Sequence, residues 1–507
     1  MKKTLFTFLI FCITKIVSAA PPAEFKLMVA PATLASNQVT VLWDKQYISG
    51  AFEYEVLLNS KVVGATNKTN YTITGLLAST QYAVSVRAKG FTSGLLKFKT
   101  PGKGKIFNIT QYGAKAEPGF KNTKAIQAAI NACTTGGTVL IPKGVFESGA
   151  LFLKSDMTLC IEKGAVLKGA VDTSDYLPLY LNRFEGWELE TYASLINAGT
   201  LNRNGSYNVK NLRITGGGTI EGGGKKLGND MISARGIRSR GRLICLMNCQ
   251  DVCIADLTIQ EPPCWTIHYI YSDNVTLQNL VINTYGIRNG DGIDPDSSTD
   301  SYIFNCSFDT GDDCIAVKSG KNPEGFFVAK PTTNVRVTNC DFIRGHGISI
   351  GSEMSGGVSD VLVQDCKAGA LINGMQIKGT KERGGYVRNV TVTDCELLQI
   401  TVFSKLSYNN DGEAAPEPPV FENFTFRNID LSKAPLTKPV IDINGFADPV
   451  HKLKNIQFSN ITLPAKARVV VNDAEKIWFT NVACTDGEKP EYVINNTTGV
   501  TYGKVTQ

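Results

Sequence analysis

A strand phrase recurs through most of this chain. The stretch at 251–259 (DVCIADLTI) returns at 274–282 (NVTLQNLVI), and the two begin 23 residues apart. Both of these copies start on Asn or Asp, alternate apolar and polar residues, and reach a second Asn or Asp before a short apolar end. Further copies begin at positions 301, 334, 360, 389, 423, 455 and 476. One such phrase cannot bury its apolar side alone, so successive copies must stack on each other.

Stacked repeats of this size predict a parallel β-helix, an all-β fold. Each coil pairs with the next at about 4.8 Å, so that like residues form ladders. A β-propeller is the main alternative, but its blades need about 40 or more residues each. Four cysteines hold the same place in the phrase, and we expect them to be buried and stacked, with disulfides the minority case. These cysteines are Cys306, Cys340, Cys366 and Cys395.

Residues 1–19 have the pattern of an export signal. A charged start precedes an apolar stretch at 4–14 and a small-residue cleavage site at 17–19. The stretch is short and is interrupted by Lys15, which argues against a mature membrane helix. No other segment is long and apolar enough to span a membrane. We therefore expect a soluble protein in the periplasm or outside the cell.

The length and charge of the chain limit which kinds of molecule it can bind. The chain has 507 residues, which favours two domains or one elongated repeat domain. Its 52 basic and 46 acidic residues give a formal net charge of +6, and three of the lysines belong to the leader. No basic run with interleaved aromatic residues occurs, so we expect no nucleic-acid partner. An anionic substrate remains open through local charge, and we expect a monomer.

Residues 22–100 predict a separate small domain. Short β-patterned runs alternate with turn residues, which is typical of an antiparallel sandwich. The order of Trp43, the sequence LLASTQY at 76–82 and alternating valines resembles a fibronectin type III domain. That resemblance implies that Trp43 is the core tryptophan and Tyr82 the corner tyrosine, with Ala78 where the family usually has proline. The domain serves either as a spacer or buttress or as a carbohydrate-binding module.

The second domain is expected at 105–507. It begins with one helical pattern at 123–133, where Asn122 or Thr123 can cap the start and Gly136 lies just beyond the end. Almost everything after it has strand character. We expect this single helix to cap the first coil of the β-helix.

Acidic residues lie in two Gly-flanked stretches that interrupt the strand pattern. These are NGDGIDPD at 289–296 and TGDDCI at 310–315, and Asp313 follows Asp291 by 22 residues, about one coil. A histidine and a lysine follow after 33 and 32 further residues, one coil each if the intervening inserts loop outward. We expect four successive coils to project these side chains into one groove: Asp291, Asp312, Asp313, His346 and Lys378.

Such a cluster suits acid/base chemistry on a glycosidic bond. Inverting hydrolysis needs one protonated carboxyl and one ionised carboxylate, roughly 6.5–9.5 Å apart. Clustered acids push their pKa values apart, which provides both forms near neutral pH. The structural alternative is that the acids are turn residues, as for Asp294 and Asp296, or surface ion pairs with Lys318 or Arg288. The coincidence of all the elements in one column favours a functional groove.

Four ordered motifs carry a family resemblance. The sequences NGDGID, TGDDC, RGHGISIGS and MQIK, at 289–294, 310–314, 344–352 and 375–378, resemble glycoside hydrolase family 28, the polygalacturonases and their relatives. The resemblance runs from about Phe107 to the C-terminus. It implies a right-handed parallel β-helix that hydrolyses α-linked galacturonate in pectic chains with inversion, without a metal or another cofactor.

The resemblance also assigns roles. It implies that Asp312 is the general acid, that Asp291 and Asp313 position and activate water, and that His346 supports the acid. Lys378 is implied to bind a substrate carboxylate, and Asn289 to orient its neighbours. The remaining predicted substrate-binding residues are Gln376, Asp294 and His268.

The sequence departs from the family pattern at two positions, and the second of them bears on the substrate. Gly290 stands where the motif usually has threonine. Gln376 stands where the family has arginine, and an amide offers only neutral hydrogen bonds in place of a bidentate grip on a carboxylate. A neutral sugar such as rhamnose would tolerate this change, so both homogalacturonan and rhamnogalacturonan remain open.

The motif neighbourhoods resemble the bacterial exo-acting branch of the family. The insert at 176–204, which contains Trp187, could close one end of the groove into a pocket. Trp265 either lines that pocket or packs between coils. Two other functions stay open, a uronate lyase that uses calcium and an arginine base, and a non-catalytic glycan-binding β-helix.

Overall fold

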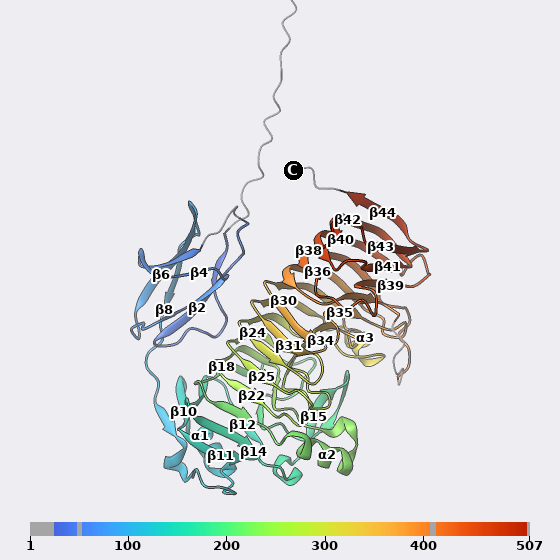
Figure 1. Cartoon of the computed structure of the whole chain (residues 1–507). Helices are drawn as coiled ribbons and strands as arrows, with labels where there is room; N and C mark the ends of the chain where they lie inside the picture. The colour runs from blue at the N-terminus through green and yellow to red at the C-terminus, as the bar shows by residue number, and fades with distance from the viewer. Residues whose placement is uncertain (1–24, 48–52, 406–411, 504–507) are drawn as a thin grey trace, which may run out of the picture.

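The computed structural model describes residues 25–47, 53–405 and 412–503. The predicted leader, residues 1–19, lies outside these ranges. The helices in the described part of the chain are all too short or too polar to cross a membrane. Figure 1 shows two bodies, a small sandwich and a long stack of coils beside it.

The N-terminal body is an antiparallel sandwich of two sheets. One sheet contains β1 (Leu27–Val29), β2 (Gln38–Trp43) and β5 (Asn70–Thr74). The other contains β3 (Tyr54–Leu58), β4 (Lys61–Thr66), β6 (Gln81–Ala88), β7 (Phe91–Thr92) and β8 (Leu96–Lys99). Trp43 is buried in the core between the sheets, and the Tyr82 hydroxyl accepts a hydrogen bond from the Leu77 N–H at 2.9 Å. Both side chains lie as the resemblance to a fibronectin type III domain predicts.

The second body is a parallel β-helix, as the repeat predicted. Its first run of paired strands contains β9 (Ile106–Asn108), β10 (Gly137–Ile141), β13 (Met157–Ile161), β18 (Val209–Thr215), β21 (Cys249–Ala255), β24 (Asp273–Gln278), β27 (Thr299–Phe304), β30 (Thr332–Thr338), β33 (Val358–Gln364), β36 (Tyr386–Glu396), β38 (Val420–Asp430), β40 (Leu453–Leu463), β42 (Ala474–Cys484) and β44 (Thr498–Gly503).

A second run follows it around each coil and merges with β36. It contains β11 (Gly144–Ser148), β14 (Ala165–Gly169), β19 (Thr219–Glu221), β22 (Thr258–Gln260), β25 (Val281–Asn283), β28 (Ser307–Asp309), β31 (Asp341–Gly345) and β34 (Lys367–Leu371).

The third run completes the coils and carries the acidic motifs. It contains β12 (Leu151–Leu153), β17 (Ile196–Ala198), β20 (Ile244–Met247), β23 (Ile267–Ile270), β26 (Ile293–Asp296), β29 (Ile315–Val317), β32 (Ile348–Ile350), β35 (Met375–Lys378), β37 (Ile400–Phe403), β39 (Ile441–Asn444), β41 (Arg468–Asn472) and β43 (Glu491–Asn495).

The recurring Asn and Asp residues make the turns of the coils. Asn279 and Asn305 have φ of 53° and 55°, a left-handed conformation that Asn and Asp adopt more readily than most residues. Their amides also link neighbouring coils, because Asn305 donates to Asn279 at 3.2 Å and Asn279 donates to Asp256 at 2.8 Å. Where a cysteine follows such a turn, its side chain is buried in the stack. All the described cysteines are free, and Cys306, Cys340, Cys366 and Cys395 are buried, as predicted.

Helices lie at the N-terminal end of the stack and along its flank. They are α1 (Thr123–Ala132), α2 (Gly224–Arg235) and α3 (Glu324–Val328). Helix α1 lies at the first coils, as predicted for the 123–133 pattern. Its N-cap is Asn122, but the Asn122 side chain bonds to the Lys115 backbone and not to the helix. The helix ends at Ala132, and its C-cap is Cys133, before Gly136.

The sandwich docks on the ladder of turns. The Lys45 ammonium lies 2.5 Å from Asp365 and 3.2 Å from Asp394, two ladder residues of successive coils. Asn70 accepts a hydrogen bond from Asn305 at 2.8 Å. A cation between two stacked carboxylates offsets their mutual repulsion. The sandwich therefore complements the ladder where the ladder is acidic.

Candidate active site

The strand register stacks the predicted acids on successive coils. Ile293 pairs with Ile315, and Ile315 pairs with Ile348. Asp291, Asp313 and His346 each precede one of these residues by two positions, so they form one column. Lys378 ends β35 on the next coil, and its ammonium lies 3.3 Å from Asp313 Oδ2. The structure thus brings together side chains that span almost 90 residues of sequence.

Asp312 and His346 form the most exposed part of this group. His346 Nδ1 lies 2.9 Å from Asp312 Oδ1, and the two side chains are 32% and 26% exposed. Burial raises the pKa of Asp312, but the hydrogen bond and charge of His346 outweigh it, so the pKa falls below its usual value. The same hydrogen bond raises the pKa of His346 above 6.5. The pair therefore retains one proton into the neutral range.

Asp313 is held from two sides. The Ser349 hydroxyl donates to Asp313 Oδ1 at 2.7 Å, and Lys378 Nζ donates to Oδ2 at 3.3 Å. The carboxylate is almost fully buried. A hydroxyl donor on one oxygen and an ammonium on the other fix the position of this carboxylate.

Asp291 belongs to a buried cluster with Asp294 and Lys318. Lys318 Nζ lies 3.4 Å from Asp291 Oδ2 and 3.1 Å from Asp294 Oδ1. Burial raises the pKa of Asp291 well above its usual value and that of Asp294 to about 7, and Lys318 offsets part of this rise. Asp291 Oδ1 has no hydrogen-bond partner among the described residues. The sequence alternative of an ion pair with Lys318 is thus correct, but the pair is buried and lies beneath the site.

Trp265 and a hairpin support this cluster. Lys318 Nζ lies 3.5 Å from the centre of the Trp265 ring, which stacks on Phe184 at 5.0 Å. Phe184 ends β15 (Tyr180–Phe184), and β15 pairs with β16 (Trp187–Thr191). Trp265 is 3% exposed, so of the two roles open for it the structure favours packing between coils.

Glycines frame His346 because side chains would not fit there. Gly345 has φ of 126°, and a Cβ there would lie 2.1 Å from the Thr310 hydroxyl. Gly347 has φ of 98°, and a Cβ there would lie 2.2 Å from the Gly374 carbonyl. Close packing of three coils therefore requires glycine on both sides of the histidine.

Thr284 joins the two loops that carry the acids. Its buried hydroxyl donates to the Gly290 carbonyl at 2.5 Å and accepts from the Gly311 N–H at 3.2 Å. A Cβ on Gly290 would lie 2.9 Å from the Ile287 carbonyl, which accounts for glycine at this position. The Thr284 hydroxyl therefore fixes the distance between the backbones next to Asp291 and Asp312.

The predicted contacts of His268 and Asp294 with substrate are not possible in this structure, because neither side chain has exposed surface. His268 lies 3.4 Å from Asp296, which forms a buried ion pair with Arg183 at 2.8 Å. Burial lowers the pKa of His268 to about 4. Asp294 belongs to the Lys318 cluster. Both residues support the floor of the site.

The other two predicted binding residues are partly exposed. Asn289 has φ of 50° and accepts a hydrogen bond from Arg240 at 2.8 Å. Gln376 is half-buried and stacks between Ser349 and Thr401 on neighbouring strands. Ser349 bonds to Asp313, so Gln376 lies one strand away from the residue that holds this carboxylate.

The hairpin also reaches a distant loop. The Trp187 indole N–H donates to the Asn322 carbonyl at 3.0 Å, and the Lys321 N–H donates to the Gly186 carbonyl at 3.0 Å. Arg203 links Glu188 of the hairpin to Glu324 of α3. The insert therefore spans from the coil of Asp296 to the loop after β29.

Sequence reasoning missed several supporting residues. Ser349 and Thr284 are ordinary polar residues of strand ends, and no sequence signal separates them from turn residues. Arg183 lies far from the motifs in sequence, in an insert that carries no repeat. Lys318 was considered only as a surface partner, although its place at the end of an apolar strand pointed to burial.

The acidic residues raise the question of a metal. Asp312, Asp313 and His346 each offer a ligand atom within 4.8 Å of the others. However, His346 Nδ1 already faces Asp312, and the Lys378 ammonium lies beside Asp313. A fixed cation next to a ligand opposes binding of a second cation. The donor set fits proton transfer better than metal binding.

Replacing Lys318 with methionine should destabilise the β-helix by about 3–5 kcal/mol, because two buried carboxyls lose the cation that pairs with both of them. Thermal unfolding of the full chain measures the loss. The loss should be smaller at acidic pH, where both carboxyls are protonated, than at alkaline pH. Lys381→Met is the control, since that side chain is 74% exposed. Equal effects of the two substitutions would contradict the role of Lys318.

Comparison with known proteins agrees with this geometry. The family model described as "Glycosyl hydrolases family 28" matches residues 133–484. The chain is 29% identical to the exo-poly-alpha-D-galacturonosidase of Dickeya chrysanthemi, over 92% of each chain. The structure resembles the family 28 exopolygalacturonase of Yersinia enterocolitica with a TM-score of 0.86 and 26% identity, over 94% of this chain and 99% of that one. It also resembles the exopolygalacturonase of Thermotoga maritima, with a TM-score of 0.61 and 25% identity, over 77% and 92%. The chain therefore belongs to glycosyl hydrolases family 28 and is a glycoside hydrolase.

Proposed function

We propose that this enzyme releases galacturonic acid from pectic chains by inverting hydrolysis. The observation that carries the proposal is the pairing of Asp312 with His346 directly beside Asp313, which Ser349 and Lys378 hold from the other side. One carboxyl can thus give a proton while its neighbour accepts one. The names of the relatives support galacturonate as the sugar.

In this mechanism Asp312 protonates the leaving oxygen, and His346 supplies the proton that the pair shares. Asp313, with Asp291, orients and deprotonates the attacking water. Asp291 is almost fully buried and its pKa is raised by burial, so we assign the proton transfer to Asp313 and to Asp291 the positioning of the groups around the water. Burial strengthens the electrostatic effect of each group on the developing charge at the sugar ring.

Substrate recognition centres on Lys378 and Gln376. The Lys378 ammonium, 13% exposed, can bind a uronate carboxylate while it stays beside Asp313. Gln376 adds a neutral amide at the neighbouring sugar site. A galacturonate at one site and either galacturonate or a neutral sugar at the other are both compatible, which includes homogalacturonan and rhamnogalacturonan oligosaccharides.

We infer attack from a chain end. The β15–β16 hairpin reaches across to the loop at 319–324, and this bridge would close one end of the cleft. The relatives named exopolygalacturonase support the same mode. An enzyme of this kind meets its polymer outside the cytoplasm, so we also propose export, and we propose that the enzyme acts as a monomer.

Two other functions fit less well. A uronate lyase would need a calcium site and an arginine base, whereas Gln376 is neutral and Lys378 occupies the side of Asp313. A non-catalytic glycan-binding β-helix would not need the proton-sharing pair. Family membership also favours hydrolysis.

Product analysis tests the proposal. Polygalacturonate incubated with the enzyme should yield monomeric galacturonate from the start, without a product that absorbs in the ultraviolet. Asp312→Asn should lower kcat roughly 10²–10⁴-fold, since the proton donor is lost. Asp341→Asn, an exposed acid on β31, is the matched control. A ladder of oligomers would refute exo attack, and unchanged activity of Asp312→Asn would refute its role.

The pH profile tests the proton-sharing pair. The hydrogen bond to Asp312 raises the pKa of His346, so activity should persist above pH 6.5 and fall as pH rises through the raised pKa. In His346→Gln the remaining activity should begin to fall at a lower pH than in the unchanged enzyme, because Asp312 alone then holds the proton. The measurement is kcat/KM against pH. If kcat/KM falls at the same alkaline pH in both enzymes, Asp312 and His346 do not share the catalytic proton.

The backbone clamp at Thr284 gives a further prediction. Thr284→Val keeps the shape but removes both hydrogen bonds, so the two acid loops should shift. We expect kcat to fall about tenfold with little change in KM, since misplaced groups slow the chemical step. Thr284→Ser restores the hydroxyl and should recover most of the rate. An equal loss in both variants would contradict the clamp.

A further inference from the structure

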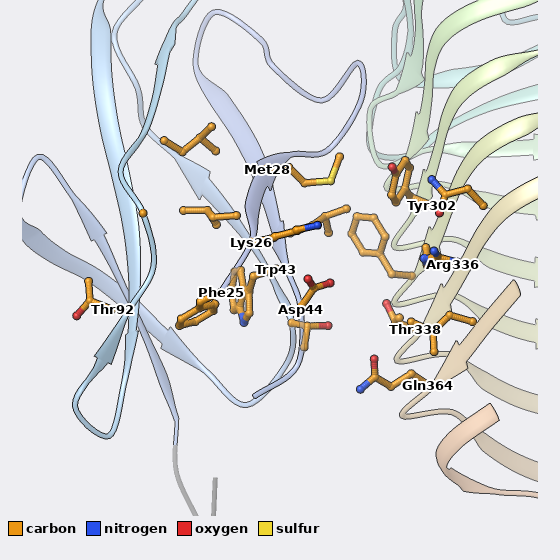
Figure 2. Close-up of a pocket in the computed structure, with 18 of the residues that line it drawn as sticks. Phe25, Lys26, Met28, Trp43, Asp44, Thr92, Tyr302, Arg336, Thr338 and Gln364 are labelled. Atoms are coloured by element: carbon orange, nitrogen blue, oxygen red, sulfur yellow. The ribbon is translucent and has the colours of Figure 1, made fainter. Parts of the chain in front are cut away.

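A second hollow lies between the sandwich and the β-helix. This interdomain groove has a volume of about 1050 Å³. Figure 2 shows side chains of both bodies facing it, including Phe25, Lys26 and Asp44 from one side and Tyr302, Arg336 and Gln364 from the other. Tyr302 and Arg336 lie on β27 and β30, whereas the catalytic candidates lie at the third run of strands. The groove is thus separate from the active-site cleft.

The groove carries charges without partners. Arg336, which is half-buried, donates to the Asp360 backbone carbonyl at 2.6 Å. Among the described residues, no ion pair within 4.0 Å involves Arg336, Lys26 or Asp44. A guanidinium that contacts only neutral carbonyls keeps its capacity to bind a carboxylate bidentately. Two cations and one acid leave the groove with an excess of positive charge.

The remaining wall suits sugar rings. Phe25 and Tyr302 present aromatic surface, which packs against the C–H faces of sugars, and Gln364 adds an amide. Asp44 can accept hydrogen bonds from sugar hydroxyls. A uronate sugar supplies all three counterparts at once: a carboxylate, hydroxyls and an apolar face. A volume of this size is in the range of small-ligand sites, which also favour domain interfaces.

The groove is pre-formed. Lys45 and Asn70 fix the sandwich to the turn ladder at Asp365, Asp394 and Asn305. Since these contacts lie on ladder residues and not in the groove, a ligand does not need to displace them. Pre-formed walls lower the entropy that binding must overcome.

We propose that the interdomain groove binds a uronate-containing oligosaccharide segment, with Arg336 and Lys26 as the carboxylate contacts. The identity of the sugar rests on the proposed function. A chain held there stays at high local concentration near the cleft, which favours repeated attack on one polymer. The sandwich would then be both a buttress and half of a binding site.

Titration calorimetry with saturated tetragalacturonate tests this on the full chain. In the Asp312→Asn background, which prevents turnover, we expect two sites. Adding Arg336→Gln should weaken one site roughly tenfold or more and leave the other. Adding Lys378→Met should instead weaken the cleft site. Tyr302→Leu, which leaves the charge in place, should also weaken the groove site, and Arg235→Gln, an exposed arginine at the end of α2, is the control.

The outcomes separate the two proposals. A single site that Lys378→Met removes and Arg336→Gln leaves unchanged would overturn the groove and keep the proposed function. No binding at either site would overturn galacturonate as the sugar. A change of oligomeric state in Arg336→Gln without loss of binding would make the groove a protein interface and overturn the proposal. Equal affinity for a neutral maltotetraose would likewise overturn the carboxylate role of Arg336.

Discussion

The register between coils is the constraint on which the rest of this structure depends. In most coils the turns beside the first run of strands pass through a left-handed Asn or Asp, and Asn amides link the side chains of successive coils. These turns and hydrogen bonds fix where each strand ends and the direction of the next strand. Without that repetition, Asp291, Asp313 and His346 would not share a column. The catalytic arrangement is therefore a product of backbone geometry before it is a product of side-chain chemistry.

Buried charge is the second theme. Beneath the site, Lys318 pairs with Asp291 and Asp294 across coils, and Arg183 of the hairpin pairs with Asp296. Burying such groups is unfavourable unless each has a partner, and removing one partner is more costly than never having the pair. These clusters hold the carboxylates of the cleft in one place and set their proton affinities. The same side chains therefore contribute to folding stability and to the chemistry of the site, so a substitution that alters one also alters the other.

Much of this could be predicted from the sequence, for a physical reason. Repeated turns with period-2 strands allow few folds, and residues one coil apart must stack, so Asp291, Asp313 and His346 could be placed together without coordinates. The failures have the same origin. Sequence spacing does not tell which face of a strand is covered by an insert, so His268 and Asp294 were expected to touch substrate although the hairpin and neighbouring coils bury them. Contacts through Thr284 and Ser349 depend on loop paths that no periodicity describes.

The parallel stack has a consequence for how such a molecule can evolve. An insertion that adds one whole coil beyond β37 lengthens the rod and leaves the register of the cleft intact. A single residue added inside a strand such as β29 would shift the later side chains of that strand to its opposite face, whereas one added to a loop stays outside the column. The length of the rod and of its loops can therefore vary, while the alternation of side chains within the central strands is fixed. Diversity within this architecture should accumulate as outward loops and extra coils, with the phase of the central repeats preserved.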